Sequence, residues 1–69
     1  SWKTLRKLFK QCGFIEKRTE GSHLIMEKPG VIRPIVIPKY AEVDIDIIKA
    51  NMRTADLTRE QYFSLLRKC

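Results

Sequence analysis

The sequence is short of the residues that build metal sites, disulfide frameworks and membrane spans. It has one histidine, His23, and two cysteines, Cys12 and Cys69, which are distant from each other and have no CxxC spacing. Two cysteines are too few for a disulfide framework, and this supply of ligands argues against a structural zinc site. The longest aliphatic runs in the expected strands have three residues, and no signal peptide is visible. We therefore expect a cytoplasmic protein without a membrane span.

Several catalytic signatures are also missing. The chain has only three glycines, no glycine-rich phosphate loop, no dinucleotide-binding fingerprint and no Ser/His/Asp set. Four glutamates are scattered over the first two thirds of the chain, at Glu16, Glu20, Glu27 and Glu42. On strands and loops such carboxylates serve more often as partners of nearby Lys and Arg than as a catalytic pair.

Positive charge is abundant for so small a chain. Fourteen Lys and Arg against eight Asp and Glu give 69 residues a net charge of +6. This balance favours a polyanionic partner, nucleic acid first, although many small proteins are basic for solubility alone. A hydrophobic content of 43% is enough for one small packed core, so we expect a single domain over residues 1–69.

The first segment, residues 2–12, has the pattern of an amphipathic helix. Its apolar residues follow a period near 3.6 and are Trp2, Leu5, Leu8, Phe9 and Cys12. The other side is basic, with Lys3, Arg6, Lys7 and Lys10. Gly13 follows where a left-handed residue ends helices, so we expect the helix to stop there.

Three strands are predicted next, over residues 14–18, 23–28 and 31–37. Turns at residues 19–21 and at Pro29-Gly30 separate them. The short connections favour an antiparallel meander in sequence order. Proline donates no ladder hydrogen bond, so Pro34 predicts that the third strand lies at an edge or carries a bulge.

Two helices complete the chain, over residues 46–53 and from Thr58 to about Arg67. Asp44 or Asp46 can cap the first, and Thr58 with Gln61 fits a capping box at the start of the second. We expect the last helix to pack Tyr62, Phe63, Leu65 and Leu66 inward. The predicted fold is a two-layer α+β sandwich whose helices cover one face of the sheet and leave the other open.

His23 is the strongest candidate for chemistry. Histidine accepts a proton near neutral pH, and RNA carries its own nucleophile in the 2′-hydroxyl, so a ribonuclease can work with a base and cationic help for the phosphate. Lys17, Arg18 and Lys39 are candidates for that help, and Ser22 shapes the turn. From the residues alone, a half-exposed strand histidine without a chemical role is the favoured explanation of His23.

The order of these features resembles the HicA toxin family, also called YcfA-like. Almost the whole chain takes part in the resemblance, with these matching features in order: a short helix ending in Gly13-Phe14, a basic strand, Gly21-Ser22-His23, a Pro-Gly hairpin, Arg33, Ile37-Pro38, and the run from Asp56 to Tyr62. The resemblance implies a fold like the double-stranded-RNA-binding domain and a metal- and cofactor-independent mRNA interferase of a type II toxin–antitoxin system. It also implies a HicB-like antitoxin that masks the active site, and it assigns the catalytic role to His23.

Some positions differ from those of the family that the chain resembles. Leu24 and Tyr40 stand where relatives commonly have further histidines, and Asp56 replaces a connector glycine. Asp can adopt left-handed backbone angles, so we expect Asp56 to do so. Tyr40 is a candidate proton donor. Three hypotheses follow: a ribonuclease toxin, an RNA-binding module of the same fold that does not cleave, and a protein-interaction domain for an acidic partner.

Overall fold

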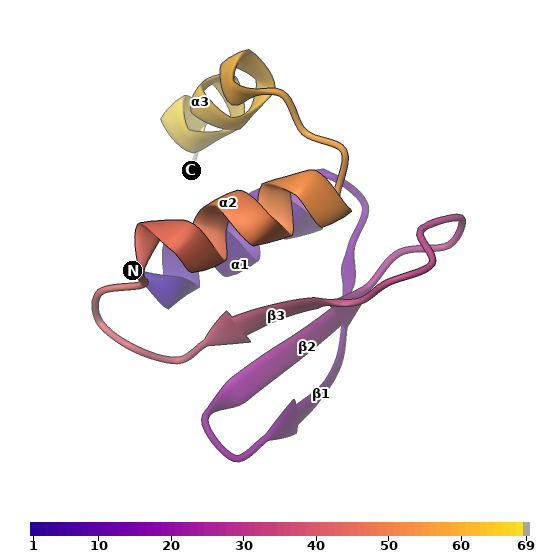
Figure 1. Cartoon of the computed structure of the whole chain (residues 1–69), viewed down its shortest axis with the longest axis vertical. Helices are drawn as coiled ribbons and strands as arrows, with labels where there is room; N and C mark the ends of the chain where they lie inside the picture. The colour runs from indigo at the N-terminus through magenta and orange to yellow at the C-terminus, as the bar shows by residue number, and fades with distance from the viewer. Residues whose placement is uncertain (69) are drawn as a thin grey trace.

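A computed structural model describes residues 1–68 of the chain (Figure 1). The elements, in order, are α1 (Trp2–Gln11), β1 (Ile15–Glu20), β2 (His23–Glu27), β3 (Ile35–Pro38), α2 (Ile45–Thr54) and α3 (Arg59–Lys68). The strands form one antiparallel sheet in the order β1-β2-β3. The helices lie on one side of that sheet, with α3 farther from it than α1 and α2 (Figure 1). The predicted α+β arrangement and the meander are therefore confirmed.

Helix α1 buries the apolar face that its periodicity predicts. Leu8 and Phe9 are fully buried, and Leu5 is nearly so. The helix ends at Gln11 with Cys12 as its C-cap, one residue earlier than predicted. Gly13 then takes a φ of 98°, in the left-handed region that the sequence predicted for it.

The first strand differs from its prediction at both ends. Phe14 precedes β1 and is buried, with its ring in an edge-to-face contact with Phe9 at a centroid distance of 5.8 Å. At the other end β1 extends to Glu20, so the turn tightens to Gly21 and Ser22. Gly21 has a φ of 57°, which allows the tight connection that the sequence assigned to a longer turn.

The third strand is shorter than predicted, because it begins only at Ile35. Gly30 has a φ of 88°, and the N–H of Val31 donates to the carbonyl of Lys28 at 3.0 Å, which turns the chain away from β2. Pro34 follows in the same connection and has no N–H to start a ladder. The prediction of a strand from residue 31 was wrong for this reason. Its edge position is confirmed, and Pro38 is its last residue.

Alternation along β2 places the core cluster on one face of the sheet and His23 on the other, where Ile25 is nevertheless buried. Leu24 and Met26 belong to the core cluster with α1 and with Ile35 and Ile37 of β3. Successive strand side chains point to opposite faces, so His23 and Ile25 point away from this core. The core therefore determines which sheet face carries His23.

The caps of α2 and α3 follow the sequence closely. The carboxylate of Asp44 accepts a hydrogen bond from the N–H of Asp46 at 3.2 Å, so Asp44 is the cap of α2. Thr58 and Gln61 exchange two side-chain-to-backbone hydrogen bonds of 2.9 and 3.1 Å, which confirms the capping box. Asp56, between the helices, has the expected positive φ of 57°.

One expectation about α3 was wrong. Phe63 does not pack inward but is 46% exposed, and no residue of this helix is fully buried. Tyr62, Leu65 and Leu66 are half-buried against the core. The helix turns only part of its apolar surface toward α1, because its apolar residues span more of its circumference than one neighbour covers.

Asn51 of α2 closes the outer edge of β3. It is buried, with 7% of its surface exposed. Its side-chain amide donates to the carbonyl of Val36 at 3.0 Å, and its side-chain oxygen accepts from the N–H of Val36 at 3.4 Å. The side chain thus takes the place of a further strand at this edge and holds α2 against the sheet.

We predict that Asn51→Ala lowers the free energy of unfolding by about 1–3 kcal/mol, because it leaves the two polar groups of Val36 without partners. Urea denaturation measures this loss. Lys49→Ala, on an exposed position of the same helix, is the matched control and should change stability by no more than about 0.5 kcal/mol. Equal stability of Asn51→Ala and the wild type would show that the edge does not depend on this amide.

Candidate nucleic-acid interface

His23 opens β2 and is exposed. Its directly opposite neighbours are Glu20 on β1 and Pro38 on β3. Opposite residues in an antiparallel sheet share a face, so Glu20 and His23 lie on the same side. Among residues 1–68 no hydrogen bond or ion pair engages the imidazole of His23. Both ring nitrogens are therefore available to a ligand.

The chain after β3 runs beside the turn that precedes His23. The N–H of Lys39 donates to the carbonyl of Ser22 at 2.7 Å. This bond extends the ladder by one residue beyond the pair of His23 and Pro38. Of the predicted site residues, Ser22, His23 and Lys39 thus have neighbouring backbones at one end of the sheet. The side chain of Lys39 extends to Trp2 on the helical side, whereas His23 points to the other face.

Three cationic side chains surround the indole ring of Trp2. The Nζ of Lys39 lies 5.2 Å from the ring centroid, the guanidinium carbon of Arg6 lies 5.4 Å away, and the Nζ of Lys3 lies 6.0 Å away. The negative face of an aromatic ring attracts cations at such distances. We call these four residues the Trp2 cation cluster. It joins the start of α1 to the segment after β3, beside Ser22.

The Trp2 cation cluster concentrates positive charge in a way that favours the binding of an anion. The first turn of α1 contains no acidic residue, although the positive end of the helix dipole lies there. The Nε of Arg6 is buried and has no hydrogen-bond partner within residues 1–68. An anion beside Lys3, Arg6 and Lys39 would reduce the repulsion between their positive charges. This arrangement therefore favours the binding of a phosphate group.

The sequence identified Lys39 as a candidate but did not identify the Trp2 cation cluster. Lys3 and Arg6 were recognised only as part of the basic outer face of the first helix. The available signal was the placement of cations one and four residues after the only tryptophan. Residues four apart on a helix lie close together, so this spacing indicates Arg6 as a partner of the Trp2 ring, whereas Lys3, one residue away, is not predicted by helix geometry.

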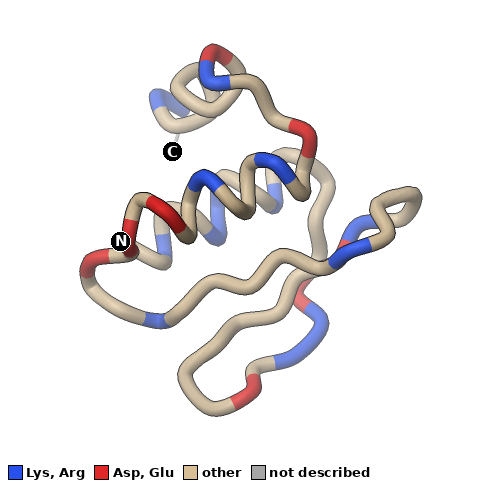
Figure 2. Tube along the Cα trace, viewed as in Figure 1, with Lys and Arg blue, Asp and Glu red and all other residues tan. Residues whose placement is uncertain are grey.

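Lys17 and Arg18 lie apart from the Trp2 cation cluster, on β1. Glu16 pairs with Met26 and Arg18 with Ile25, so Lys17 is the extra residue of a β-bulge. The Nε of Arg18 contacts the carboxylate of Glu20 at 2.6 Å, and this partner raises the pKa of the guanidinium. Arg18 and Glu20 thus share the sheet face of His23. Figure 2 shows Lys and Arg along both α1 and β1.

Glu16 points to the helical side of the sheet and pairs with α1. Its carboxylate lies 2.7 Å from the Nζ of Lys10, and this hydrogen-bonded ion pair lowers the pKa of Glu16 below its usual value. Arg6 and Lys39 lower it further by their charge. The acidic residue nearest the cations of α1 is thus held ionised, and it orients Lys10 rather than serving as a proton donor.

Other kinds of site find no support in the described part of the chain. No group of three or more His, Cys, Asp or Glu side chains within residues 1–68 is arranged to hold a metal ion. In the same range, no helix combines the length and the apolar character needed to cross a membrane.

The fold is that of a small α+β domain of the double-stranded-RNA-binding type, and the Trp2 cation cluster lies at one end of its sheet. A comparison with protein-family models identifies the family. The model described as the HicA toxin of bacterial toxin–antitoxin systems matches residues 2–57. The chain therefore belongs to the HicA toxin family. No curated protein matches the chain as a relative.

We predict that Lys10→Met raises the pKa of Glu16 toward its usual value, because the hydrogen-bonded cation is removed. An NMR titration of the Glu16 carboxyl measures this change. A lowered folded-state pKa stabilises the protein above the ordinary pKa, and that contribution disappears as the pH falls through the folded-state pKa. The stability difference between the wild type and Lys10→Met should therefore shrink under acid conditions. Lys7→Met is the matched control, and an unchanged Glu16 titration in Lys10→Met would contradict the ion pair.

Proposed function

We propose that this HicA family member is an mRNA-cleaving endoribonuclease in which His23 is the general base. The observation that carries the proposal is the hydrogen bond from Lys39 to Ser22, which connects the Trp2 cation cluster to the residue before an exposed histidine. A base and a cationic cluster on adjoining backbone are the two elements that RNA cleavage through the 2′-hydroxyl requires.

In the proposed reaction, His23 takes the proton of a ribose 2′-hydroxyl. The 2′-oxygen then attacks the neighbouring phosphorus while the bond to the 5′-oxygen breaks. The products are a 2′,3′-cyclic phosphate and a 5′-hydroxyl end. Charge builds up on the phosphate oxygens during the attack, and cations held beside it stabilise that state. The leaving oxygen takes a proton from Tyr40, which is 52% exposed and next to Lys39, or from water.

The proposed RNA contacts divide into two groups around His23. Lys39 and the Trp2 cation cluster hold phosphates on the α1 side, with Ser22 in the turn between. Lys17 and Arg18 contact the strand on the β1 side. The bulge gives Lys17 freedom to reach outward, whereas Arg18 exchanges Glu20 for a phosphate, since both are anions that pair with guanidinium.

The cellular setting is also part of the proposal. We propose that the protein acts in the cytoplasm on mRNA and that a HicB-like antitoxin masks the His23 site. The family of the chain supports both statements, since it is a family of bacterial toxin–antitoxin systems. The second candidate function is RNA binding without efficient cleavage. Leu24, which is buried in the core, favours it, because a side chain there cannot assist His23.

We predict that His23→Gln lowers the cleavage rate of purified protein on RNA by about 10²–10⁴-fold, the usual contribution of a general base. RNA affinity should change little, because the cations remain. Expression of His23→Gln in cells should likewise spare mRNA and growth. Glu42→Gln, in the loop after β3, is the control and should cleave like the wild type. Equal cleavage by His23→Gln would exclude His23 as the base, and tight RNA binding without cleavage by the wild type would favour the second candidate function.

We also predict that Arg6→Gln and Lys39→Gln each weaken RNA binding and reduce its salt dependence. Each lost phosphate contact should lower the slope of log affinity against log salt by about 0.7 for single-stranded RNA. Fluorescence anisotropy over a salt series measures both effects. Lys68→Gln, at the far end of α3, removes the same charge and should leave the slope unchanged. Equal losses in all three variants would mean that only net charge matters.

A further inference from the structure

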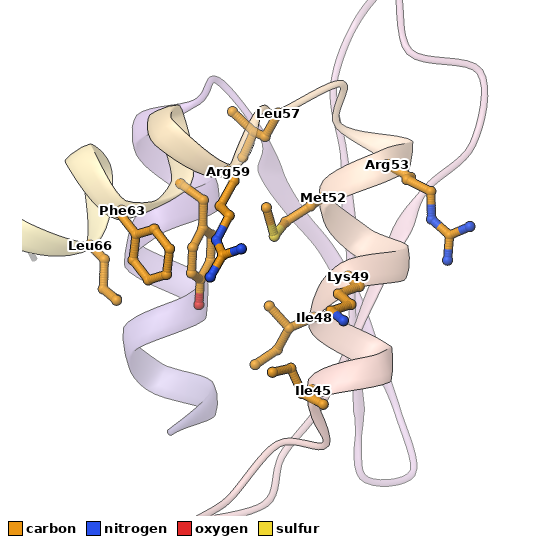
Figure 3. Close-up of a pocket in the computed structure, with 10 residues that line it drawn as sticks. Ile45, Ile48, Lys49, Met52, Arg53, Leu57, Arg59, Phe63 and Leu66 are labelled. Atoms are coloured by element: carbon orange, nitrogen blue, oxygen red, sulfur yellow. The ribbon is translucent and has the colours of Figure 1, made fainter.

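A groove between α2 and α3 lies apart from the His23 site and is lined mainly by apolar side chains. Its volume is about 640 Å³. The lining residues come from both helices and their connector: Ile45, Ile48, Lys49, Met52, Arg53, Leu57, Arg59, Tyr62, Phe63 and Leu66. In Figure 3, Ile45, Ile48 and Met52 project from α2 toward the side on which Phe63 and Leu66 lie.

The groove exposes more apolar surface than packing within the domain requires. Ile45 is 63% exposed and Phe63 is 46% exposed, and both lie on its walls. Contiguous apolar surface of this kind on a small protein marks an interaction site. The match to the family model ends at Leu57. Helix α3, which forms one wall of the groove, therefore lies outside the matched residues.

The charged residues of the groove are all cationic. Lys49, Arg53 and Arg59 line it, and none of its lining residues within residues 1–68 is acidic. The guanidinium of Arg59 lies 5.7 Å from the ring of Phe63, which holds a cation directly beside the apolar floor. Arg53 points away from α3 in Figure 3, so Lys49 and Arg59 are the charges nearest to an occupant.

We propose that this groove binds an amphipathic α-helix of a partner polypeptide, with its apolar side chains on the floor and acidic residues beside Lys49 and Arg59. A helix presents apolar anchors at positions i, i+3, i+4 and i+7, which suits a groove bordered by two helices. Each wall helix has ten residues and is thus about 15 Å long, enough for about three turns of the partner.

Charge complementarity selects this occupant over two others. A second copy of the chain would bring Lys49 and Arg59 against the same cations, and like charges across an interface cost affinity. RNA would gain little from a floor of aliphatic side chains, since its phosphates need cations and its bases need polar or aromatic partners. An acidic amphipathic helix can place apolar side chains on the floor of the groove and carboxylates beside Lys49 and Arg59.

The test uses a synthetic helical peptide of about 15 residues, with leucines at i, i+3, i+4 and i+7 and glutamates at most other positions. A second peptide has lysines in place of the glutamates. Backbone NMR spectra of the full chain are recorded during titration with each peptide. The acidic peptide should shift the resonances of α2 and α3, whereas the lysine peptide should bind at least about tenfold more weakly.

Three variants locate the binding and test its charge preference. Phe63→Gln should weaken binding of the acidic peptide about tenfold, as the loss of an aromatic anchor does. Ile32→Gln, at a fully exposed residue of the β2–β3 connection, should not weaken it. The double variant Lys49→Glu/Arg59→Glu should reverse the preference toward the lysine peptide. Phe63 is half-exposed, so its substitution should preserve the fold, and the dispersion of the NMR spectrum checks this.

Four outcomes would overturn the proposal. They are absence of acidic-peptide binding, equal binding of both peptides, RNA shifting the same groove resonances, and a concentration-dependent dimer that Phe63→Gln abolishes. The proposal does not rest on catalysis by His23. His23→Gln should bind the acidic peptide like the wild type, so the failure of either proposal is visible separately.

Discussion

The burial of Leu24 and Met26 against α1 is the constraint on which the site depends. In a chain of this size the core is a single layer of apolar side chains between the helices and one face of the sheet. So small a core tolerates few substitutions. Because side chains alternate along a strand, the burial of Leu24 and Met26 places the side chain of His23 on the opposite face of the sheet. A shift of β2 by one residue would bury the imidazole and expose the core, which is why the position of His23 is fixed by apolar residues that have no chemical role.

Cations are concentrated around Trp2, at the start of α1. The start of α1 has Lys3 and Arg6 near the positive end of its own dipole, and Lys39 joins them from the segment after β3. The ring of Trp2 and the half-buried surroundings hold these charges in place. A surface that is repulsive on its own and ordered before binding is well suited to an anionic ligand, because little side-chain entropy remains to be lost. The second surface, between α2 and α3, combines cations with apolar floor residues and so selects a different partner.

The sequence predicted local structure well and long-range structure less well. Helix α1, the capping box at Thr58 and the backbone angle of Asp56 depend on neighbours within a few residues, and all are confirmed. The role of Asn51 could not be predicted from the sequence. Its partner, Val36, is 15 residues away in the sequence and lies at a strand edge that exists only in the folded sheet. Phe63 was predicted to pack inward with the other apolar residues of the last helix, but it is 46% exposed because those residues span more of the circumference of α3 than α1 covers. The grouping of Ser22, His23 and Lys39 likewise depends on the pairing of β2 with β3.

The central claim is that the RNA supplies the nucleophile and His23 takes its proton. It is tested most directly by incubating purified protein with an RNA that it cleaves, and with the same RNA carrying a single 2′-deoxyribose on the 5′ side of the scissile phosphate. The account predicts that only the unmodified RNA is cut and that mass spectrometry finds 2′,3′-cyclic phosphate and 5′-hydroxyl ends. Cleavage of the 2′-deoxy substrate, or 5′-phosphate ends, would contradict the account, because water and not the ribose would then be the nucleophile.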